Sequence, residues 1–582
     1  MQASATSLFG LTVDDIHAWF DLATELLDIN RDTLNQANVF PVADADTGTN
    51  MLLTLRGGTR QLVREEPATA AQALHEVAQG ALINARGNSG IILAEYLRGF
   101  AHATTQQHFF DHEEHLQLTA ALESAKKFAY AAVADPVEGT ILSIAQAAAT
   151  GATDPSPVRN TDDNTDASTE EQARTVTHDT IRNAVEQART SLEQTPKHLD
   201  ILNRSHVLDA GAFGLVLVLT ALESVIAHVP AQFRSDLVAP ALQNNTAHDN
   251  TNGAKQPSPT HGKANPHNHG VTSHDFHDET IVDGEFEVMF LLHAATHEEH
   301  AQTISSTLRH RLQDIGESVV VIGGYTHTHN ALWNVHVHTD TPHAALDAAH
   351  DTCATATTYS IAQVLVRDLV RQVSQTTHTH KTPTQKSADI IACTSAPGLV
   401  PDIARTGAIV LLETDLTLTS SDVGRALSEG TGNGAVVITN SQHLAQSVHD
   451  VYPDIAVIAA TDDAQVVAAV TALNLACTNN PHSSQHELAR IGEHSLTETT
   501  TIRLDNPTHE ELQKDVLKHL EHNSSHNTIP IVTVLSDTHC ALALLADFTA
   551  RLEHIQPNAE LISLPSGRRG TGLTISLEWV HA

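Results

Sequence analysis

The stretch "NVFPVADADTGTNM", residues 38–51, decides how the first part of the chain folds. Two carboxylates, Asp44 and Asp46, are separated by one residue and lie between two hydrophobic segments. Carboxylates with this spacing on a loop can both face one hard cation, and Mg²⁺ takes a few protein oxygens while it keeps part of its water. The stretch therefore predicts a Mg²⁺ site that contains Asp44 and Asp46.

The residues after the two aspartates predict an anion site beside the cation. Gly48 allows the backbone to turn closely, so the hydroxyl groups of Thr47 and Thr49 would face a phosphate. A helix that begins near Asn50 would add its positive end. A plain surface turn is the alternative, whereas a Ca²⁺ loop is disfavoured because Leu55 stands where a bidentate glutamate is expected.

Two more glycine-rich runs each precede an apolar helix. They are "NARGNSGIILAEYLRGF" at residues 84–100 and "DAGAFGLVLVL" at residues 209–219. A single helix start of this kind is more often a packing feature than a binding site. Three in one helical domain, one of them with paired carboxylates, favour a nucleotide site formed by the loops at one end of a bundle.

The hydrophobic pattern divides the chain into helical and mixed parts. Apolar residues recur at helical spacing in the first part, where Thr12 and Asp15 predict a capping box. Later strand-like segments alternate with helices, which indicates a parallel sheet. The run "SGRRGTG", residues 566–572, is predicted to be a turn between two strands. We predict an all-helical domain (1–235), a low-complexity linker (236–278), a small α/β middle domain (279–373), a second linker (374–388) and a C-terminal α/β region (389–582).

The composition excludes several classes of function. The net charge is −37, with 69 acidic against 32 basic residues, which argues against a nucleic-acid surface. The N-terminus lacks the pattern of a signal peptide, and no run of about 18 apolar residues predicts a transmembrane segment. The four cysteines are far apart in the sequence, as is typical of buried thiols in a reducing compartment. We therefore expect a cytoplasmic protein, and the sequence leaves a homodimer open.

A second metal site is predicted in the middle domain. His336 and His338 lie two positions apart in a predicted strand, so both imidazoles project from one face and can bind one Zn²⁺. The chain contains 40 histidines, so a pair that arose by chance is the alternative.

Four motifs resemble a known family. In order, "NVFPVADADTGTN", "ARGNSGIIL", "DPVEGTILSI" and "LDAGAFGLVLVL" are similar to the DhaL domain, the L subunit of dihydroxyacetone kinase. They resemble even more the catalytic, ATP-binding subunit of bacterial fatty acid kinase. The resemblance covers roughly residues 10–225 and continues more weakly through "WNVHVHTDTP", residues 333–342, which is similar to the family's middle domain. It implies a barrel of antiparallel helices that holds Mg-ATP at one end.

The resemblance also implies roles for individual residues. Asp44 and Asp46 would be the catalytic Mg²⁺ ligands, with Asn38 near the place of a third ligand. Contacts to the nucleotide and its phosphates would come from Thr47, Gly48, Thr49, Asn50, Ser89, Gly90, Thr140, Ile141, Asp209, Ala210 and Gly211. Glu287 stands about where the family has a cysteine, as a third Zn²⁺ ligand with His336 and His338. Ala43 and Ala45 replace the usual proline and glycine of the metal loop, and alanine constrains the backbone more than glycine does.

These features predict an ATP-dependent kinase subunit that uses Mg²⁺ and ATP. The resemblance implies that its substrate is a fatty-acid carboxylate presented by a separate, DegV-like fatty-acid-binding carrier protein, and that its product is an acyl phosphate. The helical domain shows no pattern of a wide apolar pocket, which agrees with a substrate that arrives on a partner. A dihydroxyacetone-type small-molecule kinase and a non-catalytic nucleotide-binding regulatory protein are the alternatives.

Overall fold

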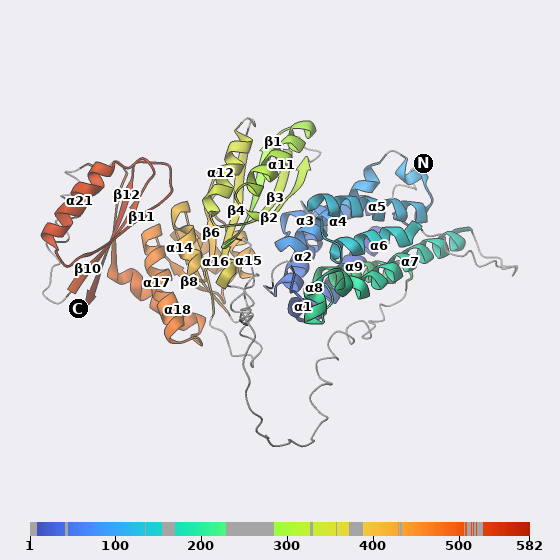
Figure 1. Cartoon of the computed structure of the whole chain (residues 1–582), viewed down its shortest axis with the longest axis horizontal. Helices are drawn as coiled ribbons and strands as arrows, with labels where there is room; N and C mark the ends of the chain where they lie inside the picture. The colour runs from blue at the N-terminus through green and yellow to red at the C-terminus, as the bar shows by residue number, and fades with distance from the viewer. Residues whose placement is uncertain are drawn as a thin grey trace, which may run out of the picture.

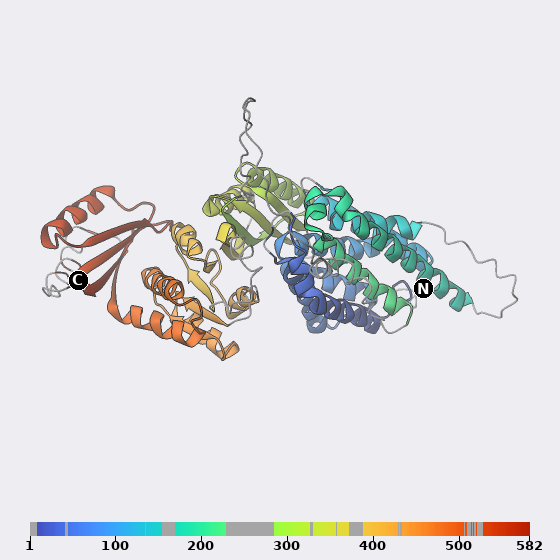
Figure 2. The same ribbon diagram turned by 60° about the horizontal axis from the view of Figure 1, so that its bottom comes forward.

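The structure is a computed structural model that describes three ranges of the chain, residues 8–228, 284–371 and 388–581. Within these ranges it leaves out residues 41–42, 44, 107, 134–135, 154–168, 326–329, 355, 357, 429, 431–433, 506, 509–513, 515, 517–519 and 521–527. The first predicted linker and nearly all of the second therefore lie outside the described residues. Figures 1 and 2 show three parts in a row, with a helical domain at one end, a large sheet in the middle and a small sheet at the other end.

The first part is helical, as the spacing of apolar residues predicted. Its α-helices are α1 (Val13–Gln36), α2 (Thr47–Glu65), α3 (Ala70–Ile83), α4 (Gly87–His102), α5 (Glu114–Ala132), α6 (Ile141–Thr153), α7 (Thr169–His198), α8 (Asp200–Ser205) and α9 (Ala210–Ile226). The predicted capping box begins α1, because the N–H of Asp15 donates to Thr12 Oγ1 at 3.3 Å and the N–H of Thr12 donates to Asp15 Oδ2 at 2.9 Å. Trp19 Nε1 donates to the carbonyl of Val218 at 3.0 Å. This bond joins α1 to α9 and closes the bundle.

A mixed sheet of eight strands follows, in the order β2-β3-β1-β4-β6-β5-β7-β8. Its first half contains β1 (Phe286–Ala295), α11 (Glu298–Gln313), β2 (Glu317–Tyr325), β3 (Asn330–Thr339), α12 (Pro342–Cys353) and β4 (Tyr359–Asp368). Its second half contains β5 (Asp389–Thr394), α14 (Val400–Arg405), β6 (Ile409–Leu412), α15 (Ser420–Leu427), β7 (Ala435–Thr439), α16 (Gln442–Val451), β8 (Ala456–Ala459) and α17 (Asp463–Asn479).

The two halves of this sheet differ in strand direction. The pairs within β1–β4 are antiparallel, whereas β5 to β8 pair in parallel, as the alternation of strands and helices predicted. Strands β4 and β6 also pair, antiparallel, through residues 364–366 and 410–412. The predicted middle domain and the first part of the C-terminal region therefore share one sheet.

Strand β2 packs this sheet onto the helical domain. Val319 and Val321 belong to the same apolar core as Leu308 of α11. Val320 and Ile322 instead belong to the core of the helical domain. Because successive side chains of a strand point to opposite faces, one alternating strand contributes to both cores.

Polar contacts hold the same interface at the turn between α3 and α4. Asn334 Nδ2 donates to the carbonyls of Leu82 at 3.0 Å and Ala85 at 3.1 Å. Arg86 Nη1 donates to the carbonyl of Arg425 at 2.9 Å, and Arg425 Nη2 donates to the carbonyl of Ala85 at 3.3 Å. Strand β3 and helix α15 thus fix the turn that directly precedes α4.

The chain continues into a four-stranded sheet with the order β11-β10-β12-β9. Its elements are α18 (Gln485–Glu498), β9 (Thr499–Leu504), β10 (Thr528–Ser536), α21 (Leu542–Ile555), β11 (Glu560–Pro565) and β12 (Leu573–His581). The run at residues 566–572 forms the loop between β11 and β12, as predicted. Among the described helices, none combines the length and the apolar character that crossing a bilayer requires.

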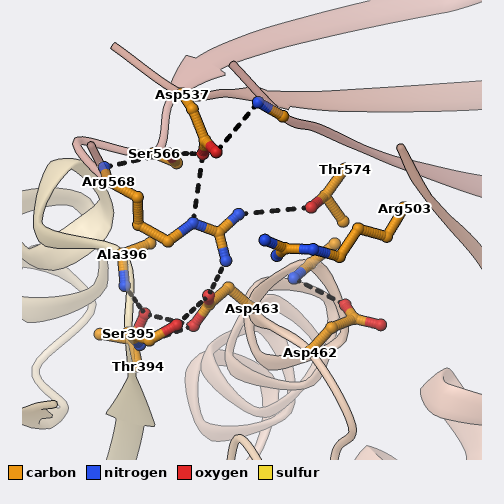
Figure 3. Close-up of polar contacts among 12 residues, drawn as sticks. Thr394, Ser395, Ala396, Asp462, Asp463, Arg503, Asp537, Ser566, Arg568 and Thr574 are labelled. Atoms are coloured by element: carbon orange, nitrogen blue, oxygen red, sulfur yellow. Dashed lines mark hydrogen bonds and ion pairs between the residues drawn. The ribbon is translucent and has the colours of Figure 1, made fainter. Parts of the chain in front are cut away.

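Arg568 joins the two sheets through this loop (Figure 3). Its Nη1 lies 3.0 Å from Asp463 Oδ2, at the start of α17, and its Nε lies 3.2 Å from Asp537 Oδ1, directly after β10. Its Nη2 also donates to Thr574 Oγ1 at 3.3 Å. Both carboxylates are buried, so this guanidinium provides the charge that balances two acids at the junction.

Candidate nucleotide and metal site

The first turns of three long helices meet at one end of the helical domain. Helix α2 starts at Thr47, α4 at Gly87 and α9 at Ala210. Thr47 Oγ1 lies 3.3 Å from Ser89 Oγ, which connects α2 to α4. A Cβ on Gly211 would lie 3.6 Å from the same Ser89 Oγ, which places α9 beside them. Because the N-terminus of a helix carries partial positive charge and free N–H groups, this junction favours an anion.

Helix α2 begins three residues earlier than predicted, at Thr47 instead of near Asn50. Asp46 is its N-cap residue, and the carbonyl of Asp46 accepts the N–H of Asn50 at 2.8 Å. Ala45 adopts a positive φ of 57°. A left-handed conformation is costly for alanine, and it falls at the position where the resembling family has glycine.

The predicted phosphate contacts divide into two groups. Thr47, Asn50 and Ser89 line a small polar pocket. Thr49 instead contacts α1, since its N–H donates to Asn35 Oδ1 at 3.0 Å. The remaining two are glycines that pack helices together: a Cβ at Gly48 would lie 2.3 Å from the carbonyl oxygen of Arg31, and one at Gly90 would lie 2.3 Å from Thr54 Oγ1.

A cavity of about 560 Å³ lies beside the polar pocket. Asn88 and Ser89 line both spaces. The cavity also brings together the predicted Thr140, Ile141, Asp209 and Gly211 with Phe40, Ile92, Val133, Val137 and Leu142. One wall comes from the middle domain, through Gln313 and residues 316–320. A largely apolar cavity of this size with a polar end has the form of a small-molecule site.

Asp209 caps α9 from within this cavity. Its Oδ1 accepts the N–H of Ala212 at 2.7 Å, and its own N–H donates to Thr195 Oγ1 at 3.2 Å. Burial raises the pKa of Asp209 to about 7, although the hydrogen bond from Ala212 opposes the shift. The carboxyl group is therefore poised to hold or release a proton at neutral pH.

Gly211 gives a test of the cavity that separates binding from folding. Its Cβ would meet nothing closer than 3.5 Å, so Gly211→Ala should fold normally and change stability by at most about 1 kcal/mol in the favourable direction. The added methyl group projects beside Ser89 and should weaken nucleotide binding by about tenfold, or 1.4 kcal/mol. Calorimetric titration with ATP and thermal unfolding measure the two effects.

The control for this prediction is Gly90→Ala, where the new methyl group would collide with Thr54. That variant should lose stability through overpacking, by about 1–3 kcal/mol. Unchanged ATP affinity in Gly211→Ala would show that the nucleotide does not occupy this end of the cavity.

The middle domain carries the predicted metal triad into the polar pocket. Glu287, His336 and His338 are buried, and one ligand atom from each lies within 4.8 Å of the others. The register pairs Glu287 with His338 across β1 and β3, His336 Nε2 lies 3.0 Å from His338 Nε2, and His336 Nδ1 lies 3.5 Å from Glu287 Oε1. Burial, with the nearby His338 and Arg367, holds the pKa of His336 well below its usual range. His336 is therefore neutral, which is the form that binds metals.

The two predicted metal sites lie in one pocket. Asn38, Asp46 and Thr47 line it together with the Glu287, His336 and His338 triad, and Thr47 Oγ1 donates to Asn38 Oδ1. Arg367 of β4 connects the domains, because its Nη2 lies 3.5 Å from Asp46 Oδ2 and its Nε donates to Glu287 Oε2 at 2.7 Å. Asp44 lies outside the described residues. Arg367 and the wall at 316–320 were not predicted, since neither has a local motif.

A helical bundle in which three helix starts surround an anion pocket, joined to a domain that completes the pocket, defines the class of this protein. Residues 41–224 match the DAK2 domain, and residues 283–373 match the FakA-like middle domain of fatty acid kinase. The chain thus carries these two domains in this order, which confirms the resemblance predicted from the motifs.

Curated relatives match mainly over one segment. The protein YloV of Bacillus subtilis is 35% identical over 190 residues, 32% of this chain and 31% of its own length. A Staphylococcus haemolyticus protein is 34% identical over 189 residues, with the same shares. The match thus spans about a third of these relatives. Among solved structures, the dihydroxyacetone kinase from C. freundii in complex with AMP-PNP and Mg²⁺ has 18% identity and a TM-score of 0.26, and the match covers 36% of this chain and 33% of that one.

Proposed function

We propose that this chain is an ATP-dependent kinase subunit that phosphorylates a fatty-acid carboxylate held by a separate lipid-binding protein. The carrying observation is the composite pocket, in which the starts of α2 and α4 meet the middle domain beside a 560 Å³ cavity. The match to the FakA-like middle domain of fatty acid kinase supports the acyl substrate. The DAK2 domain alone fits a dihydroxyacetone-type kinase as well, so the middle domain favours the first function.

The donor atoms in the pocket fit Mg²⁺. Asp46, Asn38 and Thr47 supply oxygens at the anion-binding end, and Mg²⁺ prefers carboxylate, carbonyl and water oxygens. When bound, Mg²⁺ would neutralise charge on the phosphates of ATP. The backbone N–H groups at the starts of α2 and α4 and the hydroxyl of Ser89 would bind the phosphate oxygens, while the apolar cavity with Asp209 and Gly211 would hold the nucleoside.

We also propose Zn²⁺ binding at Glu287, His336 and His338. Two imidazole nitrogens and one carboxylate oxygen form a donor set that zinc accepts. Because Arg367 engages Glu287 Oε2, Oε1 is the oxygen that would face the metal. Metal analysis of the purified chain tests this directly, and loss of zinc from His336→Ala but not from the neighbouring His343→Ala would support it.

The transfer needs no protein nucleophile. A carboxylate oxygen forms a bond to the γ-phosphorus as the bond to the β–γ bridging oxygen breaks, and ADP leaves with the electron pair. The products are an acyl phosphate and ADP, and no proton is exchanged. The chain's part is to position the phosphates and to stabilise charge that develops on them.

We expect the purified chain to phosphorylate free fatty acid poorly and to gain turnover when a DegV-like carrier is added. A long acyl chain needs an extended apolar pocket, because each buried methylene contributes about 0.8 kcal/mol. The described cavity is of nucleotide size and has polar residues at its phosphate end. A carrier would keep the alkyl chain buried and expose only the carboxylate.

ADP release with oleate is the measurement, made with and without a purified carrier loaded with oleate. Full activity on free oleate without a carrier would contradict the carrier and favour a self-contained kinase. Absence of ADP release with any carrier or with dihydroxyacetone, together with tight ATP binding, would indicate a nucleotide-binding regulatory protein.

A further inference from the structure

Arg367 is a buried cation that the middle domain brings to the phosphate end of the helical domain. It lies in β4, where its cross-strand partner is Glu287 of β1. Its side chain is 12% exposed and pairs with Glu287 and Asp46. Both of these acids line the polar pocket. The guanidinium therefore lies at the pocket wall, between an acid of each domain.

We propose that Arg367 contacts the transferred phosphoryl group, so that the middle domain supplies a catalytic residue to the helical domain. This inference rests on the proposed kinase function. In the structure Arg367 balances the charge of Asp46. A cation that binds Asp46 takes over this role, and the freed N–H groups of Arg367 then face the anion that arrives with the cation.

The residue type fits this task. Arginine keeps its charge at all relevant pH values and presents a planar fork of N–H donors that matches phosphate oxygens two at a time. Glu287 holds the guanidinium from the side of the middle domain through Nε and Nη2. A side chain fixed in this way is pre-organised, so it loses little freedom when a phosphate binds.

Attachment of the two domains does not account for Arg367. Asn334 and Arg425 already fix the sheet to the carbonyls of the turn before α4, and Val320 and Ile322 of β2 already pack in the core of the helical domain. A buried ion pair adds little net stability compared with apolar packing, because two charges lose their water. Its position between two acids of the pocket points instead to a role in charge balance during transfer.

The chemistry sets the expected specificity. As the γ-phosphoryl group moves to the carboxylate oxygen, negative charge spreads over its equatorial oxygens and onto the leaving ADP. A contact at this group is present with ATP and absent with ADP. Arg367 should therefore discriminate between the two nucleotides as well as raise the rate.

The test is Arg367→Met in the full chain, with titration of AMP-PNP and of ADP in the presence of Mg²⁺. We expect the Kd for AMP-PNP to rise about tenfold or more and the Kd for ADP to stay within about threefold. Phosphoryl transfer to the carrier-bound fatty acid should fall by about 10²–10³-fold. Arg367→Lys keeps the charge but loses the fork, so it should restore only part of the difference between the nucleotides.

Two further variants separate this role from folding. Arg371→Met is the matched control, because Arg371 follows β4 directly and donates to the carbonyl of Arg405, away from the pocket. The double variant Arg367→Met with Glu287→Gln removes the unpaired acid and should show the same loss of AMP-PNP affinity with a normal unfolding transition. Equal losses for AMP-PNP and ADP, or normal transfer by Arg367→Met, would overturn the inference. Failure of the unaltered chain to bind either nucleotide would contradict the proposed function itself.

Discussion

Asp46→Asn is expected to slow phosphoryl transfer by about 10²–10³-fold, the scale of losing one main electrostatic stabiliser. The substitution keeps the shape of the side chain and removes one negative charge from the pocket. Asp46 is 3.5 Å from Arg367, and its side chain makes no capping hydrogen bond to α2. Asparagine is as good an N-cap residue as aspartate, so the fold should survive.

The measurement is ADP release at saturating carrier, with thermal unfolding as the check on the fold. Asp32→Asn is the control, because Asp32 is an exposed acid of α1 that pairs with its neighbour Arg31. This variant should retain full activity. Activity of Asp46→Asn within about threefold of the unaltered chain would remove Asp46 from the site.

Arg568→Met is expected to destabilise the junction of the two sheets by about 3–5 kcal/mol, because it leaves buried carboxylates without their counter-charge. Asp463 is 2% exposed and Asp537 is 8% exposed. Asp463 keeps hydrogen bonds from Thr394 and Ser395, and these neutral donors replace only part of the lost interaction. The four-stranded sheet should therefore open more often while the helical domain is unaffected.

Hydrogen exchange resolves this effect by region. Amides of β10 and β12 should exchange about 100-fold faster or more, whereas those of α1 and α9 should not change. Arg503→Met is the control, since Arg503 pairs with the exposed Asp505 at 3.0 Å and a surface pair contributes about 0–1 kcal/mol. Partial recovery by adding Asp463→Asn would confirm that the unpaired acid causes the loss. Equal exchange in Arg568→Met and Arg503→Met would contradict it.

Local patterns predicted much of this molecule. The Thr12–Asp15 capping box, the helix starts at Gly87 and Ala210, and the parallel strands β5–β8 all occur where the sequence indicates. Each depends on residues within about one or two turns, where spacing and capping chemistry act directly. The start of α2 was predicted three residues late, because the Thr-Gly-Thr-Asn run has the composition of a turn and yet adopts the helix.

Contacts between distant segments were outside the reach of these patterns. Glu287, Arg367 and His338 form one row because β1 pairs with both β4 and β3 in particular registers. A shift of one residue would turn each of these side chains to the other face. Nothing in the residues around Arg367 indicates that Asp46, some 300 positions earlier, lies beside it.

The sequence by itself determined the paired acid and glycine-rich helix starts, the order of helical and mixed parts, and the two histidines on one strand face. Only the tertiary structure decided that these features share one pocket, that β2 closes the nucleotide cavity, and that β4 pairs with β6 to fuse two predicted regions into one sheet. The reason is physical. Helix starts and strand alternation arise from neighbouring residues, whereas docking follows from the burial of complementary faces, such as Val320 and Ile322 against the helical core.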